Sequence, residues 1–195
     1  MYKSKAPIID KLEQVKLAYE RIAARQGQIV LEKRGRYHAD LDFHAFVTSA
    51  RSIFQYATKE IKESKKTSKS TYKQKLRLYD DYVGRVPIFK FFANLRDDEI
   101  HDGPATHGVT VEFGPKGLEP RVKYQIMKRL ETGPKLHRGL SLAGKHDLIE
   151  GMKKGGVIYQ AVECDGEDDL FELCQNYVEE IEKFIDFGIL SGFIT

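Results

Sequence analysis

The chain has 195 residues, of which 41% are apolar and 31% charged, so it fits one folded domain and not an intrinsically disordered chain. No apolar run approaches the ~18 residues that a membrane helix needs, and residues 1–10 lack the apolar core of a signal peptide. Only Cys164 and Cys174 are present, which excludes a disulfide scaffold and a cysteine-based zinc site. We therefore expect one cytoplasmic domain over residues 1–195 that contacts no membrane and holds no metal or cofactor.

The net charge of +3 is divided unevenly along the chain. Residues 163–195 hold ten acids and one base, so the preceding residues carry a net charge of +12. Two arrangements fit this asymmetry. In one, the basic part faces an anionic partner. In the other, the acidic C-terminal segment packs against the basic part and neutralises it.

Apolar residues recur at steps of three and four along most of the chain, which is the pattern of amphipathic helices with one buried face. The pattern predicts helices at residues 8–26, 39–63, 72–86, 88–101 and 167–195. Pro87 lies between the third and fourth of these helices. A proline there breaks or kinks the helix, or serves as the first residue of the next one.

Between the fourth and fifth predicted helices the sequence changes to the two-residue period of a strand. Residues 109–113 alternate strictly between apolar and polar side chains, and residues 121–127 alternate again after a segment rich in turn residues. These two segments predict a hairpin, and residues 157–164 predict a third strand.

The expected fold is therefore mainly α. Helices within residues 8–103 and 167–195 form a bundle, and a small antiparallel β-sheet at about residues 109–164 is inserted before the C-terminal helix. The sequence contains no internal repeat of the kind that would predict a solenoid.

Residues 96–101, at the end of the fourth predicted helix, carry the side chains best suited to chemistry. Arg96 lies at the edge of an apolar stripe, where a guanidinium is costly unless it is paired or faces an interface. His101 lies in the last helical turn beside several carboxylates, and a Gly-Pro pair soon follows it. A surface network of ion pairs, with His101 favoured by the helix dipole, explains the same residues without any chemistry.

The sequence RDDEIH (residues 96–101) resembles the Arg-x4-6-His motif of HEPN-domain proteins, in which a polar residue such as Asp97 commonly follows the arginine. Upstream, LDFHAFVTSARSIFQYATKE (residues 41–60) looks like the long second helix of that family. The Phe-rich IFKFFANLRDDEIH (residues 88–101) looks like its motif-bearing helix. The resemblance covers residues 38–103, and the strands that follow match nothing in the family.

The resemblance implies a helical bundle that often forms a homodimer with its two motifs facing each other. For many members it also implies RNA cleavage without a metal ion, in a toxin or defence role and with a nucleotidyltransferase-like antitoxin as partner. On that interpretation His101 is the general acid and base, Arg96 holds the phosphate, and Asp97 orients one of the two. RNA supplies its own nucleophile, the 2′-hydroxyl. Other members are non-catalytic binding or assembly modules, and this alternative stays open.

A second candidate site is the basic stretch at residues 59–77, which holds eight bases and two acids. The candidates for contacts to an RNA backbone are Lys65, Lys66, Lys69 and Lys73. A solvated corner between two helices explains the same composition.

Overall fold

The computed structural model describes the backbone of residues 5–25, 33–102, 106–112, 121–130, 158–161, 163–167 and 169–195. Side chains are described for residues 7–25, 41–95, 124–126, 163–167 and 169–195. Within these ranges the chain is mainly helical, which confirms the predicted fold class at that level. None of the described helices combines the length and the apolar character that spanning a bilayer requires.

Along the chain, the described elements are four helices, then three strands, and then a last helix. The helices are α1 (Lys5–Ala24), α2 (Lys33–Ser64), α3 (Lys69–Arg85), α4 (Pro87–Asp102) and α5 (Leu170–Leu190). The strands are β1 (Thr106–Glu112), β2 (Arg121–Leu130) and β3 (Ile158–Ala161).

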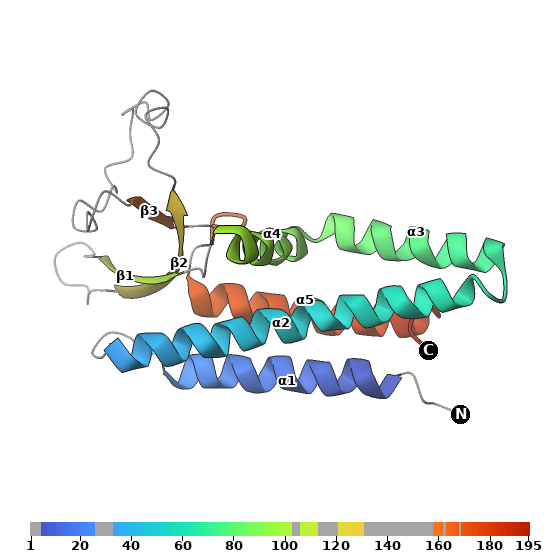
Figure 1. The fold of residues 1–195 in the computed structure, drawn as a ribbon, viewed down its shortest axis with the longest axis horizontal. Coiled ribbons are helices and arrows are strands. Elements are labelled where there is room, and N and C mark those ends of the chain that lie inside the picture. The colour runs from blue at the N-terminus through green and yellow to red at the C-terminus, as the bar shows by residue number, and fades with distance from the viewer. Residues whose placement is uncertain are drawn as a thin grey trace, which may run out of the picture.

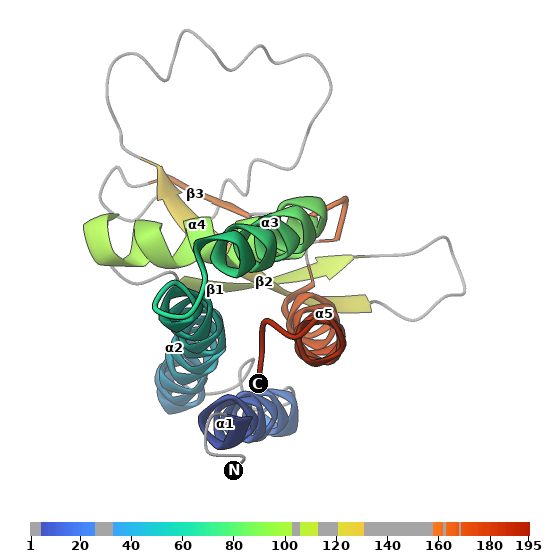
Figure 2. The same cartoon turned by 90° about the vertical axis from the view of Figure 1, so that its right-hand side faces the viewer.

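The helices α1, α2 and α5 run side by side along the long axis of the molecule (Figure 1). Seen along that axis, α3 lies on the far side of α2 and α5 from α1 (Figure 2). The next helix, α4, crosses the direction of α3 and contacts α2, α3 and α5. The sheet lies at the end of the bundle where α4 stops and α5 starts.

Two residues fix the boundaries of α3. Ser68 caps its start, because its side-chain oxygen accepts a hydrogen bond from the Thr71 N–H at 3.3 Å. At its end, Val86 takes an extended conformation, as a residue before proline prefers, and Pro87 becomes the first residue of α4. Of the alternatives that the sequence left open for Pro87, the start of a new helix is therefore the one observed.

The three strands form an antiparallel sheet in the order β1-β2-β3, and the register places Val109 opposite Tyr124. Tyr124 and Ile126 on the central strand are buried. The Tyr124 ring meets the Phe171 ring of α5 edge to face, with centroids 5.0 Å apart. This contact packs the sheet on the first turn of α5.

The start of α5 is set by a turn and a cap. Asp165 (φ 53°) and Gly166 (φ 82°) form a tight turn in the left-handed region that these two residue types tolerate. Asp169 then accepts a hydrogen bond from the Phe171 N–H at 2.9 Å. The helix predicted from residue 167 therefore begins at Leu170.

The prediction of a helix through residue 195 is wrong for the C-terminal tail, which we define as the five residues after Leu190. Gly192 takes a φ of +72°, and its N–H donates to the Ile189 carbonyl at 3.2 Å. The Phe193 N–H donates to the Gly188 carbonyl at 3.0 Å. These two bonds satisfy the last carbonyls of α5 and turn the tail back onto the helix.

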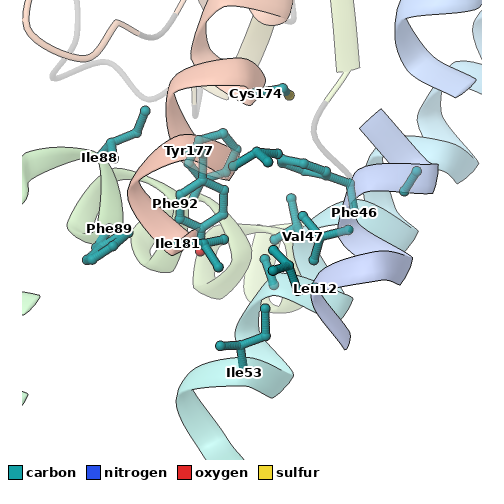
Figure 3. Close-up of a cluster of buried hydrophobic side chains, with 14 of the residues drawn as sticks. Leu12, Phe46, Val47, Ile53, Ile88, Phe89, Phe92, Cys174, Tyr177 and Ile181 are labelled. Carbon is teal, nitrogen blue, oxygen red and sulfur yellow. The ribbon is translucent and has the colours of Figure 1, made fainter. Parts of the chain in front are cut away.

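Buried side chains from α1, α2, α4 and α5 form one continuous cluster that is rich in aromatic rings. The Tyr177 ring of α5 stacks on the Phe92 ring of α4, with centroids 4.0 Å apart and an angle of 8° between the planes. Phe46 of α2 meets these rings edge to face at 5.9 Å and 5.8 Å (Figure 3). Three helices are therefore joined at this point.

We expect this core to lose stability at alkaline pH. Burial raises the pKa of the Tyr177 phenol and of the Cys174 thiol above their ordinary values. As the pH rises, these two groups therefore ionise in the unfolded chain before they ionise in the folded protein. The free energy of unfolding is unaffected below pH ~8.5 for the thiol and below pH ~10 for the phenol, and it falls as the pH rises above these values. The limiting loss is about 1.4 kcal/mol per pH unit for each group.

Urea unfolding measured at a series of pH values from neutral to alkaline checks this expectation. Tyr177→Phe removes the buried phenol and keeps the ring, so the loss of stability above pH ~10 should be shallower in that variant. Equal slopes for the native chain and for Tyr177→Phe would contradict the assignment.

Candidate functional site

The three predicted catalytic residues, Arg96, Asp97 and His101, lie in the last two turns of α4. We call them the motif. At 3.6 residues per turn, Asp97 and His101 are one turn apart on the same side of the helix, whereas Arg96 and His101 are rotated by about 140°. Along the helix Asp97 is thus one turn before His101 and next to Arg96 in sequence. Contacts of these three side chains lie outside the described residues.

The turns of α4 that precede the motif are fixed in the core. Phe89, Phe92 and Leu95 are buried at steps of three, and the stacking of Phe92 on Tyr177 sets the rotation of the helix. The motif follows directly, and β1 starts at Thr106, shortly after the helix ends. The sequence thus places the motif where the bundle meets the sheet (Figure 1).

The four predicted RNA-contacting lysines lie at the turn between α2 and α3, which we call the basic corner. Lys65, Lys66, Lys69 and Lys73 are all exposed there. Two of them have partners within the chain, because Lys66 forms an ion pair with Glu63 and the Lys65 ammonium lies 5.8 Å from the centroid of the Tyr72 ring. Exposed pairs of this kind are weak, so an anionic ligand can compete for these lysines.

The basic corner lies at the start of α3, and the motif lies beyond the other end of α3, in the last two turns of α4. Lys65 and Lys66 precede α3 and Lys69 and Lys73 lie in its first two turns, and the 17 residues of α3 span about 25 Å. Figure 1 shows the corner at the end of the bundle away from the sheet. A single chain therefore does not bring the two groups of predicted site residues together.

A groove of about 540 Å³ lies between α2, α3, α4 and α5. Its floor is apolar and consists mainly of Val47, Phe54, Phe89, Phe92 and Tyr177. Tyr79 and Val83 of α3 form one wall, and Ala93 lines the groove from α4, the helix that carries the motif. Cations along α2 form the rim, namely Arg51, Lys59 and Lys62.

Sequence reasoning missed this groove. Lys59 and Lys62 belong to the basic stretch, but their position beside the buried residues Ala57 and Ile61 was not interpreted as the rim of a cavity. One signal in the sequence could have indicated it. The spacing of the bases keeps them on one side of α2, and this side flanks the apolar stripe of the helix. The walls come from three other helices, so the sequence alone does not reveal the enclosed space.

The uneven charge of the chain is partly compensated within the fold. Lys16 of α1 and Glu182 of α5 form an ion pair at 2.6 Å, and the hydrogen bond to Glu182 raises the pKa of the lysine. At this one contact the acidic C-terminal helix pairs with a base from the preceding part of the chain. The basic corner lies elsewhere and keeps its exposure.

Within the described ranges, no group of three or more His, Cys, Asp and Glu side chains is placed to hold a metal ion. No family model, no curated protein and no solved structure matches this chain.

Proposed function

We propose that this chain is a HEPN-like endoribonuclease of the toxin or defence type, which acts in the cytoplasm without a metal ion. The observation that carries the proposal is the position of Arg96, Asp97 and His101 in the last two turns of one helix. The preceding turns of that helix are anchored in the aromatic core. A catalytic group needs such a rigid base, because small displacements from the productive geometry are costly in rate.

The proposed reaction uses the 2′-hydroxyl of RNA as nucleophile. His101 takes the 2′-hydroxyl proton, a bond forms between O2′ and phosphorus, and the bond from phosphorus to O5′ breaks. The products are a 2′,3′-cyclic phosphate and a 5′-hydroxyl, whose oxygen must receive a proton. Arg96 holds the phosphate oxygens, and Asp97, one turn before the histidine, orients the imidazole.

This chemistry favours a homodimer. One group must take a proton while another gives one, and each chain contributes a single motif histidine. Two copies related by a twofold axis, with their motifs facing each other, supply both groups. The nucleotidyltransferase-like antitoxin that the resemblance implies would then act by blocking the paired motifs or the surface beside them.

The basic corner has a separate role in this proposal. Its lysines hold the backbone of an RNA strand that extends beyond the cleaved phosphate, because most of the length of α3 separates them from the motif helix. Contacts to phosphates position RNA without reading its sequence. The corner therefore contributes affinity rather than the choice of the cleaved bond.

Induction of the native chain in a bacterial host is expected to arrest growth. His101→Ala and Arg96→Ala, expressed to the same level, are expected to relieve the arrest. Lys90→Ala, which removes an exposed cation from the same helix outside the motif, should not relieve it. With purified protein and single-stranded RNA in the presence of EDTA, each motif substitution should slow cleavage at least about a hundredfold.

Two results would overturn the catalytic proposal. One is a native chain that neither arrests growth nor cleaves RNA as a purified dimer. The other is cleavage that persists in both motif variants. Binding of RNA without cleavage would identify the chain as the non-catalytic binding module that the resemblance also allows.

A further inference from the structure

We propose that the groove between α2, α3, α4 and α5 binds a medium- or long-chain fatty acid. Its carboxylate would lie at Lys59 and Lys62, and its acyl chain would lie on the apolar floor toward Val47. This site is separate from the motif and from the basic corner. The inference goes beyond the proposed cleavage of RNA and does not depend on it.

The floor of the groove suits an acyl chain better than a nucleobase. Stacking of a base needs an exposed ring face. Phe89, Phe92 and Tyr177 are buried, and the Phe54 ring is packed against Phe89 and Phe184, with centroids 5.0 Å away in each case. These buried rings leave no free face for a base to stack on, and the mainly apolar lining of the groove suits a flexible hydrocarbon.

The dimensions of the groove also select among ligands. From Val47 to Lys62 the groove follows α2 for 15 residues, which corresponds to about 22 Å. A single acyl chain is narrow enough and of suitable length.

The charges at one end of the groove fit a carboxylate. Lys59 and Lys62 are exposed and three residues apart, so they are neighbours on the surface of α2. The two acids beside them have other partners as well, although the charge of Lys59 also reaches Glu63 and contributes to lowering the pKa of its carboxyl group, after the hydrogen bond from Lys66. Glu60 accepts hydrogen bonds from the N–H and the hydroxyl of Thr195 at 2.8 Å and 3.3 Å, and Glu63 pairs with Lys66.

The wall of the groove formed by α3 is the part that can yield to admit a ligand. None of the residues of α3 is buried, although its partly buried apolar side chains pack against the core. An element with few buried contacts separates from its neighbours at low cost. Ligand entry by a small movement of α3 leaves the core of α1, α2, α4 and α5 in place.

The test is isothermal titration calorimetry of the full chain with dodecanoate, beside dodecanol and octanoate as ligands that lack the charge or part of the chain. One dodecanoate is expected to bind per chain, more tightly than dodecanol by about tenfold or more. Octanoate should bind more weakly by roughly threefold to fourfold for each missing methylene.

Two pairs of variants locate the ligand. Lys59→Gln with Lys62→Gln should weaken dodecanoate at least about tenfold and leave dodecanol unchanged. The control double variant, Arg21→Gln with Lys90→Gln, removes the same charge from exposed positions outside the groove and should leave both ligands unchanged.

Ala93→Phe should place a ring in the groove and reduce binding, whereas Asn94→Phe adds the same ring at the next exposed position, outside the lining. Circular dichroism and thermal unfolding verify that each variant is folded. The proposal is overturned if dodecanoate does not bind saturably, if dodecanol binds equally well, or if Ala93→Phe and Asn94→Phe behave alike. None of these readouts uses RNA, so they are independent of the proposed cleavage.

Discussion

Phe184→Ala is expected to lower the free energy of unfolding by about 3–5 kcal/mol, the range for deleting a buried aromatic ring. Phe184 lies on α5 and is fully buried. Its ring lies between 5.0 and 6.1 Å, centroid to centroid, from the rings of Phe54, Tyr79, Tyr82, Phe89 and Phe193. These neighbours come from α2, α3, α4 and the C-terminal tail, so the cavity would open where four segments meet.

Urea unfolding at neutral pH measures this loss. Phe187→Ala is a suitable comparison, because Phe187 lies one turn further along the same helix and is only partly buried. Its removal deletes the same atoms but leaves a smaller cavity, so a loss of about half the size is expected. A loss below about 1 kcal/mol for Phe184→Ala would show that the surrounding helices collapse into the space and that the core is less rigid than its ring contacts indicate.

The helices were predictable because each turns one apolar stripe toward the core, partly buried in α3 and buried in the other helices, and such a stripe leaves its period in the sequence. The boundaries were less predictable, because polar first turns carry no such period. The α3 helix begins at Lys69 rather than at residue 72, since Ser68 caps it from within a Lys/Ser/Thr segment that looks like a loop. Pro87 was recognisable as a boundary, since proline has few positions in a helix.

The candidate site was predictable only where it is local in sequence. The motif lies within two turns of one helix, so a pattern of residues sufficed to single it out. Contact between the motifs of two chains depends on how the folded surfaces fit together. A dimer surface of this kind leaves no periodic pattern in one sequence. The groove combines residues from four helices, and the distance between the motif and the basic corner follows from the direction of α3. These relations exist only after the chain has folded.

The C-terminal tail was the clearest error, and it leads to a further test. A glycine after a periodic stripe ends a helix, and Gly192 does so here, but the apolar pattern extends through Phe193 and Ile194. Both side chains are buried because the tail folds back over Gly188 rather than because the helix continues. The apolar residues therefore indicated burial correctly and the type of element wrongly.

Gly188→Ala is accordingly expected to lower the free energy of unfolding by about 1–3 kcal/mol, the usual cost of overpacking. A Cβ at this position would lie 2.6 Å from Ile194 Cδ1 and 2.8 Å from Phe193 Cε2, so these two packed side chains, or the tail that carries them, must shift to admit it. The change also raises helix propensity by about 1 kcal/mol, which offsets part of the loss. Phe193 is fully buried, so displacing the tail removes apolar contacts from the core.

Gly84→Ala in α3 is the matched control, because a Cβ there meets nothing within 4 Å and the position is exposed. The same substitution should raise the free energy of unfolding there by up to about 1 kcal/mol through helix propensity and the reduced freedom of the unfolded chain. Urea unfolding measures the change in the free energy of unfolding for both substitutions. A decrease at Gly188 and an increase at Gly84 would separate the loss of tail packing from the effect of replacing glycine by alanine in a helix. If both substitutions stabilise the protein, the tail does not pack on Gly188 in solution, and the burial of Phe193 is not part of the native core.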